Sequence, residues 1–284
     1  MGFERVMVTG ATGMLGSELV PYLCAIGYEV QAMDSARLNL LGTQEDIDRA
    51  LSALHPQVVI HAAAYTAVDA AEREAELAMA INKDATRKLA LAAKAIGAIF
   101  VYVSTDFVFD GLKTDPYMVG DRPNPISVYG LSKYYGELMV AELLEEYYII
   151  RTSWLYGISK RNFVHFVLDA ARQGQEVRIA TDTFGTPTWT GSLCDAIHRI
   201  MTSGAFGIHH ASDAGVVSRY DQATAICEAA GLSPDHIRPC LAEELALPAT
   251  RPRYSALDCG ELPIPAWTTA LQAYLEQYHS LEIS

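Results

Sequence analysis

Tyr129 and Lys133 stand four residues apart in Tyr-Gly-Leu-Ser-Lys, and their side chains are of the kinds that move protons. Residues at this spacing share one face of a helix, which brings the phenol and the ammonium together. A neighbouring ammonium stabilises the phenolate and lowers the phenol pKa from its ordinary value of about 10. A phenol tuned in this way gives a proton to a carbonyl oxygen while a hydride reaches the carbon. The pair alone is also typical of ordinary surface packing.

Thr105 is a second hydroxyl side chain at a place where ligands bind. It lies in Ser104-Thr105-Asp106, directly after an apolar run typical of a buried strand. In doubly wound parallel sheets, ligands bind at the carboxyl ends of the strands. We therefore expect a hydroxyl in Ser104-Thr105-Asp106 to hold the carbonyl oxygen that Tyr129 protonates.

Gly10, Gly13 and Gly16 lie in TGATGMLG, between a short apolar strand and the start of a helix. Such a turn brings the backbone close to a pyrophosphate and points the helix N-terminus at the phosphates. The spacing is GxxGxxG rather than the commoner GxGxxG. The strand before and the helix after it favour a dinucleotide site over a purely structural turn.

Asp34 ends the second expected strand, about twenty residues after the glycine turn, as in known dinucleotide sites. A carboxylate there accepts hydrogen bonds from an adenosine ribose, which favours NADH. Arg37 suits the 2′-phosphate of NADPH instead, and an aspartate at this place is also typical of a solvated turn. We therefore expect NADPH or NADH as the cofactor, with the choice between them open.

Strands alternate with helices over the first half of the chain. Apolar runs predict strands at 5–8, 29–33, 57–61, 98–103 and 147–151. Helices are expected over 14–26, over 43–54 with Thr43 as N-cap, over 75–95 closed by Gly97, and from beyond 125 to about 146. Continuously apolar strands between helices predict an α/β fold, with a Rossmann-like, doubly wound parallel sheet.

The pattern weakens after Trp154, where the expected strands become short and Pro and Gly more frequent. We expect residues 1–154 to form the dinucleotide-binding core. Residues 155–284 are expected to form mainly a smaller, mixed substrate-binding part on the C-terminal side, with some segments returning to the core.

The composition excludes several classes of protein. Acidic residues outnumber basic ones by 34 to 21 among 284 residues, and a net charge of −13 argues against nucleic acid and anionic membranes as partners. The N-terminus lacks the layout of a signal peptide, and no apolar stretch is long enough to span a bilayer. Five dispersed cysteines predict reduced thiols and no metal site, which favours a soluble cytoplasmic protein. His61, His209 and His210 lie on apolar strands and are expected to be structural.

Longer motifs extend over nearly the whole chain. They are HAAAYTAVD from His61, STDFVFDG from Ser104, RTSWLY from Arg151, FGTPT from Phe184, and Arg251-Pro252 followed by SALD from Ser255. With the glycine turn they resemble the dTDP-4-dehydrorhamnose reductases, a family of the extended short-chain dehydrogenase/reductase superfamily. The resemblance implies NAD(P)H-dependent reduction of the C4 keto group of dTDP-4-dehydro-L-rhamnose to dTDP-L-rhamnose, a precursor of cell-surface polysaccharide.

The resemblance also implies roles for individual residues. Tyr129 would give the proton, Thr105 would orient the keto oxygen, and Lys133 would hold the nicotinamide ribose and tune Tyr129. Cofactor contacts are implied for Gly10, Gly13, Met14, Leu15, Gly16, Asp34, Asn39, Leu40, Ala64, Tyr65, Thr66, Tyr129 and Lys133. Substrate contacts are implied for Thr105, Asp106, Trp154 and Arg251. On composition alone, Trp154 is more typical of a core aromatic, and Arg251 would be either a diphosphate clamp or a solvated charge.

Two positions depart from the family pattern. Asn39 stands where relatives often have an acidic residue near the adenine, and Phe107 stands where many have Tyr. The difference at Asn39 leaves open which cofactor is used, and the difference at Phe107 leaves open which sugar is bound.

Alternative functions therefore remain. One is a reductase or epimerase of another nucleotide-linked sugar, and another is a non-catalytic NADP-binding regulatory subunit like that of methionine adenosyltransferase. The intact Thr105, Tyr129 and Lys133 argue against the regulatory subunit. Relatives are often dimers, sometimes with a divalent metal, so a homodimer and Mg²⁺ stay open, and the sequence places no metal ligand.

Overall fold

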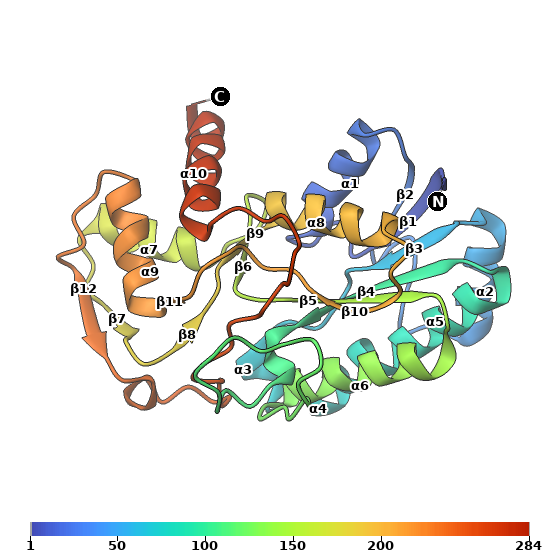
Figure 1. Cartoon of the computed structure of the whole chain (residues 1–284), viewed down its shortest axis with the longest axis horizontal. Helices are drawn as coiled ribbons and strands as arrows, with labels where there is room; N and C mark the ends of the chain where they lie inside the picture. Colours follow the sequence, from blue (N-terminus) through green and yellow to red (C-terminus); the bar gives the residue numbers. More distant parts are fainter. Residues whose placement is uncertain (1, 284) are drawn as a thin grey trace.

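The computed structural model describes residues 2–283, and six parallel strands form its main sheet. The strands lie in the order β10-β5-β4-β3-β1-β2 (Figure 1). Their bounds are β1 Arg5–Thr9, β2 Glu29–Met33, β3 Val58–His61, β4 Ile99–Thr105, β5 Tyr147–Thr152 and β10 Gly207–His210. The chain runs outward from β1 to β2 and then crosses to β3 on the other side. This reversal creates the crevice in which doubly wound sheets bind ligands, and it confirms the predicted fold class.

Helices cover both faces of this sheet. One face carries α1 Gly16–Ala25 and α8 Thr190–Thr202, and the other carries α2 Gln44–Leu54, α5 Ala85–Ile96 and α6 Val128–Leu143 (Figure 1). Successive strand residues point to opposite faces, so Val6 and Val8 pack under the first pair while Met7 packs under the other three. The strands are buried on both faces, which explains their continuously apolar sequences.

Local sequence signals fix several helix ends. Thr43 caps α2 in a capping box with Asp46, and Gly97 ends α5 in the left-handed conformation at φ 70°, as predicted. The expected helix over 75–95 consists of α4 Ala75–Met79, a π-helical turn at Ala80–Asp84, and α5. A short helix, α3 Val68–Ala71, precedes it.

The remaining segments build a smaller part with its own core. It contains the helices α7 Phe163–Gln173, α9 Arg219–Ala229 and α10 Trp267–Ile283, and the strand pair β7 Val177–Ala180 and β12 Ile237–Cys240. Four two-residue strands, β6 Leu155–Tyr156, β8 Phe184–Gly185, β9 Thr188–Trp189 and β11 Val217–Ser218, connect it to the main sheet (Figure 1). Short 3-10 helices lie at Asp106–Val108 and Ala242–Leu245.

Two elements from the later half of the chain belong to the main sheet. β10 pairs in parallel with β5, and α8 packs across the face that it shares with α1. Among residues 2–283, no helix combines the length and apolarity needed to cross a membrane.

Candidate active site

The helix α6 carries Tyr129 and Lys133, and small residues let it approach the sheet closely. Ser127 caps its N-terminus, since the Ser127 Oγ accepts a hydrogen bond from the Gly130 N–H at 3.1 Å. A Cβ on Gly136 would lie 2.2 Å from the Tyr102 hydroxyl, so only glycine permits this approach to β4. The helix is therefore held against the strand that ends at Thr105.

A buried ion pair fixes the position of α6 over two strands. Arg151 on β5 donates from Nε to Glu137 Oε1 at 2.9 Å and from Nη2 to Glu137 Oε2 at 2.6 Å. Ser104 on β4 donates to Glu137 Oε1 at 2.6 Å. The sequence analysis missed Glu137, although it continues the spacing of Tyr129 and Lys133 by another four residues.

The Tyr129 phenol lies beside Thr105. Burial raises the pKa of Tyr129 to about 12, and of the weaker influences the neighbouring Thr105 hydroxyl lowers it and the Asp106 charge raises it. The phenol is therefore protonated at neutral pH and available as a proton donor. The Thr105 hydroxyl donates to Asp106 Oδ1 at 3.0 Å and accepts from the Phe107 N–H at 3.2 Å.

Lys133 does not lower the Tyr129 pKa, contrary to the expectation from their spacing. Its Nζ donates to the Val103 carbonyl oxygen at 2.7 Å and lies 4.0 Å from the centre of the Tyr102 ring. Burial lowers the pKa of Lys133 to about 7, against the attraction of Glu137. The helical spacing places Tyr129 and Lys133 on the same face of the helix. Their pKa values are set mainly by the burial of the two groups.

Asn82, in the π-helical turn, joins the 64–66 segment to α6. Its Oδ1 accepts from the Tyr65 N–H at 2.8 Å, and its Nδ2 donates to the Tyr65 carbonyl at 3.0 Å and to Ser132 Oγ at 2.8 Å. Ser132 donates in turn to the Tyr129 carbonyl at 2.7 Å. The sequence analysis missed Asn82, whose only signal is a polar residue within an alanine-rich helix.

The glycine turn has the close contacts that a dinucleotide site needs. Gly10 has φ +69°, and a Cβ there would lie 2.7 Å from the Ala63 backbone. A Cβ on Gly16 would lie 2.2 Å from the Gly10 carbonyl oxygen. The side chain of Leu15 packs in the core, which leaves its backbone and that of Met14 at the mouth of α1. The glycines thus let the turn pack closely against the segment after β3 and against its own backbone.

The segment after β2 is ordered by its own polar side chains. The Asp34 Oδ1 accepts from the backbone N–H groups of Ala36 and Arg37 at 3.0 and 2.9 Å. Asn39 Oδ1 accepts from the Leu41 N–H at 3.0 Å, and Leu40 packs partly against the core. One Asp34 oxygen therefore closes a turn.

A cavity of 560 Å³ lies between the main sheet and the smaller part of the chain. Its lining includes Phe107, Trp154, Phe163, Arg178, Arg219 and Arg251. Phe107 connects the cavity to the catalytic residues, because its ring packs edge-on against Tyr129 with the ring centres 5.6 Å apart. The volume is within the usual range for small-molecule sites, about 300–1,000 Å³.

Asp106 lies directly behind the Phe107 wall of this cavity. Its Oδ2 is buried and has no hydrogen-bond partner among the described residues. Burial raises the pKa of Asp106 to about 6. An unpartnered buried oxygen of this kind is suited to accept a hydrogen bond from a hydroxyl group entering the site.

Trp154 is a wall of the cavity rather than a core aromatic. Its backbone is left-handed, with φ 45°, and a Cβ on Gly185 would lie 2.5 Å from its indole. Arg219 stacks on the indole, with its guanidinium carbon 3.5 Å from the ring centre. Arg251 reaches the cavity but is tied to Asp69 by two hydrogen bonds of 2.9 and 2.8 Å.

His61 and His210 have structural surroundings. The His61 ring is hydrogen-bonded to Thr9 Oγ1 at 2.7 Å and to Thr86 Oγ1 at 3.1 Å, and burial lowers the pKa of His61 to about 3. The His210 Nδ1 pairs with the Asp258 carbonyl at 3.1 Å, and burial lowers the pKa of His210 to about 4. Both rings are neutral at physiological pH. The five cysteines are free thiols, as expected.

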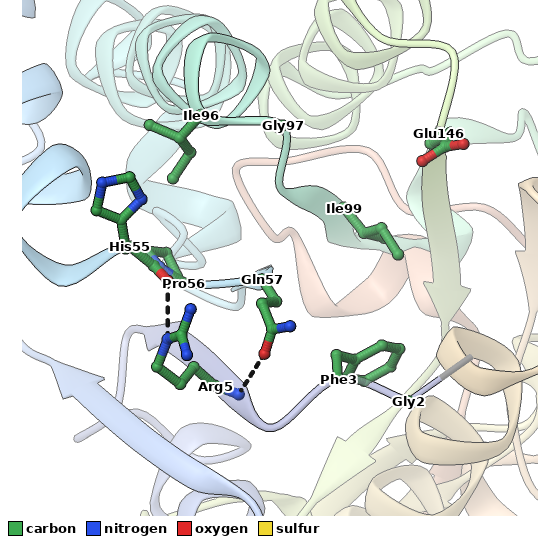
Figure 2. Close-up of a pocket in the computed structure, with 10 residues that line it drawn as sticks. All are labelled: Gly2, Phe3, Arg5, His55, Pro56, Gln57, Ile96, Gly97, Ile99 and Glu146. Atoms are coloured by element: carbon green, nitrogen blue, oxygen red, sulfur yellow. Dashed lines mark hydrogen bonds between the residues drawn. The ribbon is translucent and has the colours of Figure 1, made fainter.

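A second cavity lies at the amino ends of the strands, far from these groups (Figure 2). It is crossed by hydrogen bonds that join the start of β1 to the segment before β3, from Arg5 Nε to the His55 carbonyl and from the Arg5 N–H to Gln57 Oε1, both at 3.1 Å. Doubly wound sheets bind ligands at the opposite edge, so we assign no chemistry to this cavity. Within residues 2–283, no three His, Cys, Asp or Glu side chains form a metal-ligand group.

Comparison with known proteins gives one family. The family model described as "RmlD substrate binding domain" matches residues 4–280. A dTDP-4-dehydrorhamnose reductase of Mycolicibacterium smegmatis is 38% identical over 278 residues, 95% of this chain and 84% of the relative. A dTDP-4-keto-6-deoxy-D-glucose reductase of Streptomyces niveus is 34% identical, with 94% of this chain and 95% of the relative covered. The crystal structure of a dTDP-4-dehydrorhamnose reductase from Bacillus anthracis in complex with NADP matches with a TM-score of 0.93, at 34% identity over 97% of this chain and 100% of that one.

Proposed function

The chain belongs to the dTDP-4-dehydrorhamnose reductase family, and we propose that it reduces the C4 keto group of dTDP-4-dehydro-L-rhamnose to dTDP-L-rhamnose with NADPH or NADH. The observation that supports this most is the placement of a protonated Tyr129 beside Thr105, at the end of β4. The glycine turn stands at the same edge of the sheet, and the cavity adjoins Phe107. A carbonyl group between these features meets a proton donor on one side and a nicotinamide on the other.

The glycine turn fits a dinucleotide. Gly10, Gly13 and Gly16 would hold the pyrophosphate at the N-terminus of α1, with the backbone of Met14 and Leu15. Asp34, Asn39 and Leu40 would border the adenosine, and Ala64, Tyr65 and Thr66 would lie along the nicotinamide half. When bound, the reduced nicotinamide supplies the hydride. Arg37 follows Asp34 and suits a 2′-phosphate, and the similar structure from Bacillus anthracis holds NADP.

The chain's own residues handle the proton. Tyr129 donates its hydroxyl proton to the C4 oxygen, and Thr105 fixes that oxygen by turning its hydroxyl away from Asp106. Lys133 would hold the nicotinamide ribose, and Tyr129, whose pKa burial raises to about 12, carries the proton that is donated at neutral pH.

The cavity fits the sugar nucleotide. Trp154 presents an indole to the sugar ring, and the free Asp106 oxygen accepts a bond from a sugar hydroxyl. Arg251 forms an ion pair with Asp69 and lines the cavity.

A different nucleotide sugar is the second candidate. The relative from Streptomyces niveus carries the name of a reductase of another dTDP-linked keto sugar at comparable identity. Phe107 stands where many relatives have Tyr, so the cavity wall lacks a hydroxyl at this position. A difference in the sugar that is bound would act through this residue. A non-catalytic NADP-binding subunit is disfavoured, because Thr105, Tyr129 and Lys133 are all present.

We further propose that the protein works in the cytoplasm, on a dissolved nucleotide sugar, as a homodimer. The net charge of −13 and the free thiols support this setting. Light scattering with and without Mg²⁺ measures the assembly, and a monomer under both conditions contradicts the dimer.

A panel of nucleotide-linked keto sugars tests the function. Purified enzyme is mixed with NADPH or NADH, and the absorbance of the reduced nicotinamide is followed. We expect the highest kcat/KM with dTDP-4-dehydro-L-rhamnose. Faster turnover of another dTDP or UDP keto sugar moves the substrate assignment, and oxidation of no cofactor with any of them contradicts a reductase.

A further inference from the structure

Four arginines line the 560 Å³ cavity, and they divide into two pairs by their partners. Arg178 is bound to Glu244, and Arg251 is bound to Asp69. Among the described residues, Arg219 and Arg253 have no carboxylate within ion-pair distance. The two therefore have no acidic side chain paired with them directly, although the charge of Asp106 acts on Arg219 from a longer distance.

Arg219 is held by aromatic rings rather than by an anion. Its guanidinium carbon lies 3.5 Å from the Trp154 ring centre and 4.8 Å from that of Phe163. Its one side-chain hydrogen bond, of 3.0 Å, runs from Nη1 to Gln222 Oε1. Stacking orients the planar fork but satisfies none of its N–H donors, so several donors remain for a ligand.

The surroundings favour an anion at this place. Burial lowers the pKa of Arg219, and the charge of Asp106 raises it, yet the group remains a cation at neutral pH. A half-buried cation without a directly paired anion is unfavourable, and an anionic ligand relieves part of this cost when it binds. Arginine matches phosphate oxygens through two parallel hydrogen bonds.

We propose that Arg219 binds the diphosphate of the nucleotide sugar, with Arg253 as an outer contact at the exposed rim of the cavity. The proposal rests on the proposed function for the class of substrate. Arg219 touches Trp154, and Phe107 lines the same cavity and touches Tyr129. A diphosphate on Arg219 thus leaves its attached sugar next to the indole and within reach of the catalytic wall. Arg251, the arginine named in the sequence analysis, is held by its ion pair with Asp69.

Binding of dTDP and of thymidine separates a phosphate contact from general damage to the cavity. Calorimetry measures both ligands on the wild type, Arg219→Gln and Arg219→Lys. Arg178→Gln is the matched control, because it removes a positive charge from the same cavity at a residue that already has a partner. We expect Arg219→Gln to weaken dTDP binding about 10- to 100-fold, Arg219→Lys to retain part of it, and thymidine binding to stay unchanged.

The proposal is overturned if Arg219→Gln binds dTDP like the wild type, or if it loses thymidine equally. It is overturned also if Arg178→Gln weakens dTDP binding as much as Arg219→Gln does. Should Arg219→Gln fail to fold, the proposal requires that Arg219→Lys still weakens dTDP and spares thymidine. Wild-type enzyme that binds dTDP through Arg219 but reduces no dTDP-linked keto sugar contradicts the proposed function alone.

Discussion

Glu137 and Arg151 meet in a two-point ion pair that is almost completely removed from water, with their side chains 3% and 1% exposed. The pair joins α6, which carries Tyr129, to β5, and Ser104 adds a bond from β4. Three elements that approach the active site are thereby fixed to one carboxylate. A lone charge left in this place would be unpaired in a medium of low polarity.

Removing one partner of this pair should destabilise the protein strongly. We expect Glu137→Gln to lower the free energy of unfolding by about 3–5 kcal/mol, because Arg151 stays buried without its anion. Urea denaturation measures the change. The double variant Glu137→Met with Arg151→Met should cost less than the sum of the single changes. Asp169→Asn, at the exposed pair with Arg161, is the control and should cost less than about 1 kcal/mol. If Glu137→Gln and Asp169→Asn lower the free energy of unfolding equally, burial does not strengthen the effect of losing a charge partner.

Tyr129→Phe should abolish turnover but not cofactor binding. Without the phenol proton, kcat should fall about 10²-fold or more, since the donor is lost in the transition state. Stopped-flow absorbance and NADPH fluorescence titration measure the two quantities. Tyr135→Phe changes an exposed tyrosine on the same helix and should leave kcat unchanged. Wild-type turnover by Tyr129→Phe rules the mechanism out.

Asn82→Ala should weaken cofactor binding and stability together. It leaves the partly buried N–H and carbonyl of Tyr65 without these partners, at a cost of up to about 1–3 kcal/mol each. We expect a KM for NADPH raised about tenfold or more, because the 64–66 segment is no longer fixed to α6. Asn82→Asp keeps the acceptor for the Tyr65 N–H, and its KM for NADPH should lie between those of Asn82→Ala and the wild type. An unchanged KM for NADPH in Asn82→Ala disproves the positioning role.

Asp106 should make stability depend on pH between about 4 and 6. Burial raises the pKa of its carboxyl to about 6, from an ordinary value of 3.8. In this window the folded state holds the proton and the unfolded chain does not, so the contribution of Asp106 falls as the pH rises. Over the whole window the loss is at most about 3 kcal/mol.

Unfolding free energies at pH 4 and pH 7 measure this effect. The loss between the two pH values should be smaller in Asp106→Asn than in the wild type. Asp235→Asn, an exposed aspartate, should behave like the wild type. Identical pH dependence in Asp106→Asn and the wild type would show that the Asp106 carboxyl keeps its ordinary pKa.

The parts of the fold that depend on local sequence could be predicted. β2 was expected at 29–33 and occupies those residues, and the ends of α2 and α5 follow Thr43 and Gly97. These features arise from side chains that act on their own backbone within a few residues. The weakening of the pattern after Trp154 likewise indicated short and mixed strands.

The contacts that fix the site depend on residues far apart in sequence. Glu137 and Arg151 are joined only once α6 lies over β5, and Asn82 reaches Ser132 across 50 positions. The titration of Lys133 follows from burial, which the spacing to Tyr129 does not encode. The ion pair of Arg251 could not be predicted for the same reason, because its partner Asp69 lies 182 positions away in the sequence.

The late addition of β10 and α8 to the main sheet also affects how the chain is made. The ribosome finishes β5 at Thr152, but the helix that covers the α1 face ends only at Thr202. At about 5–20 residues per second, translation leaves the part of that face under α8 uncovered for roughly 3–10 s. Nascent chains therefore expose apolar residues of the sheet for longer than the order of the first five strands suggests, and aggregation is a hazard during this interval.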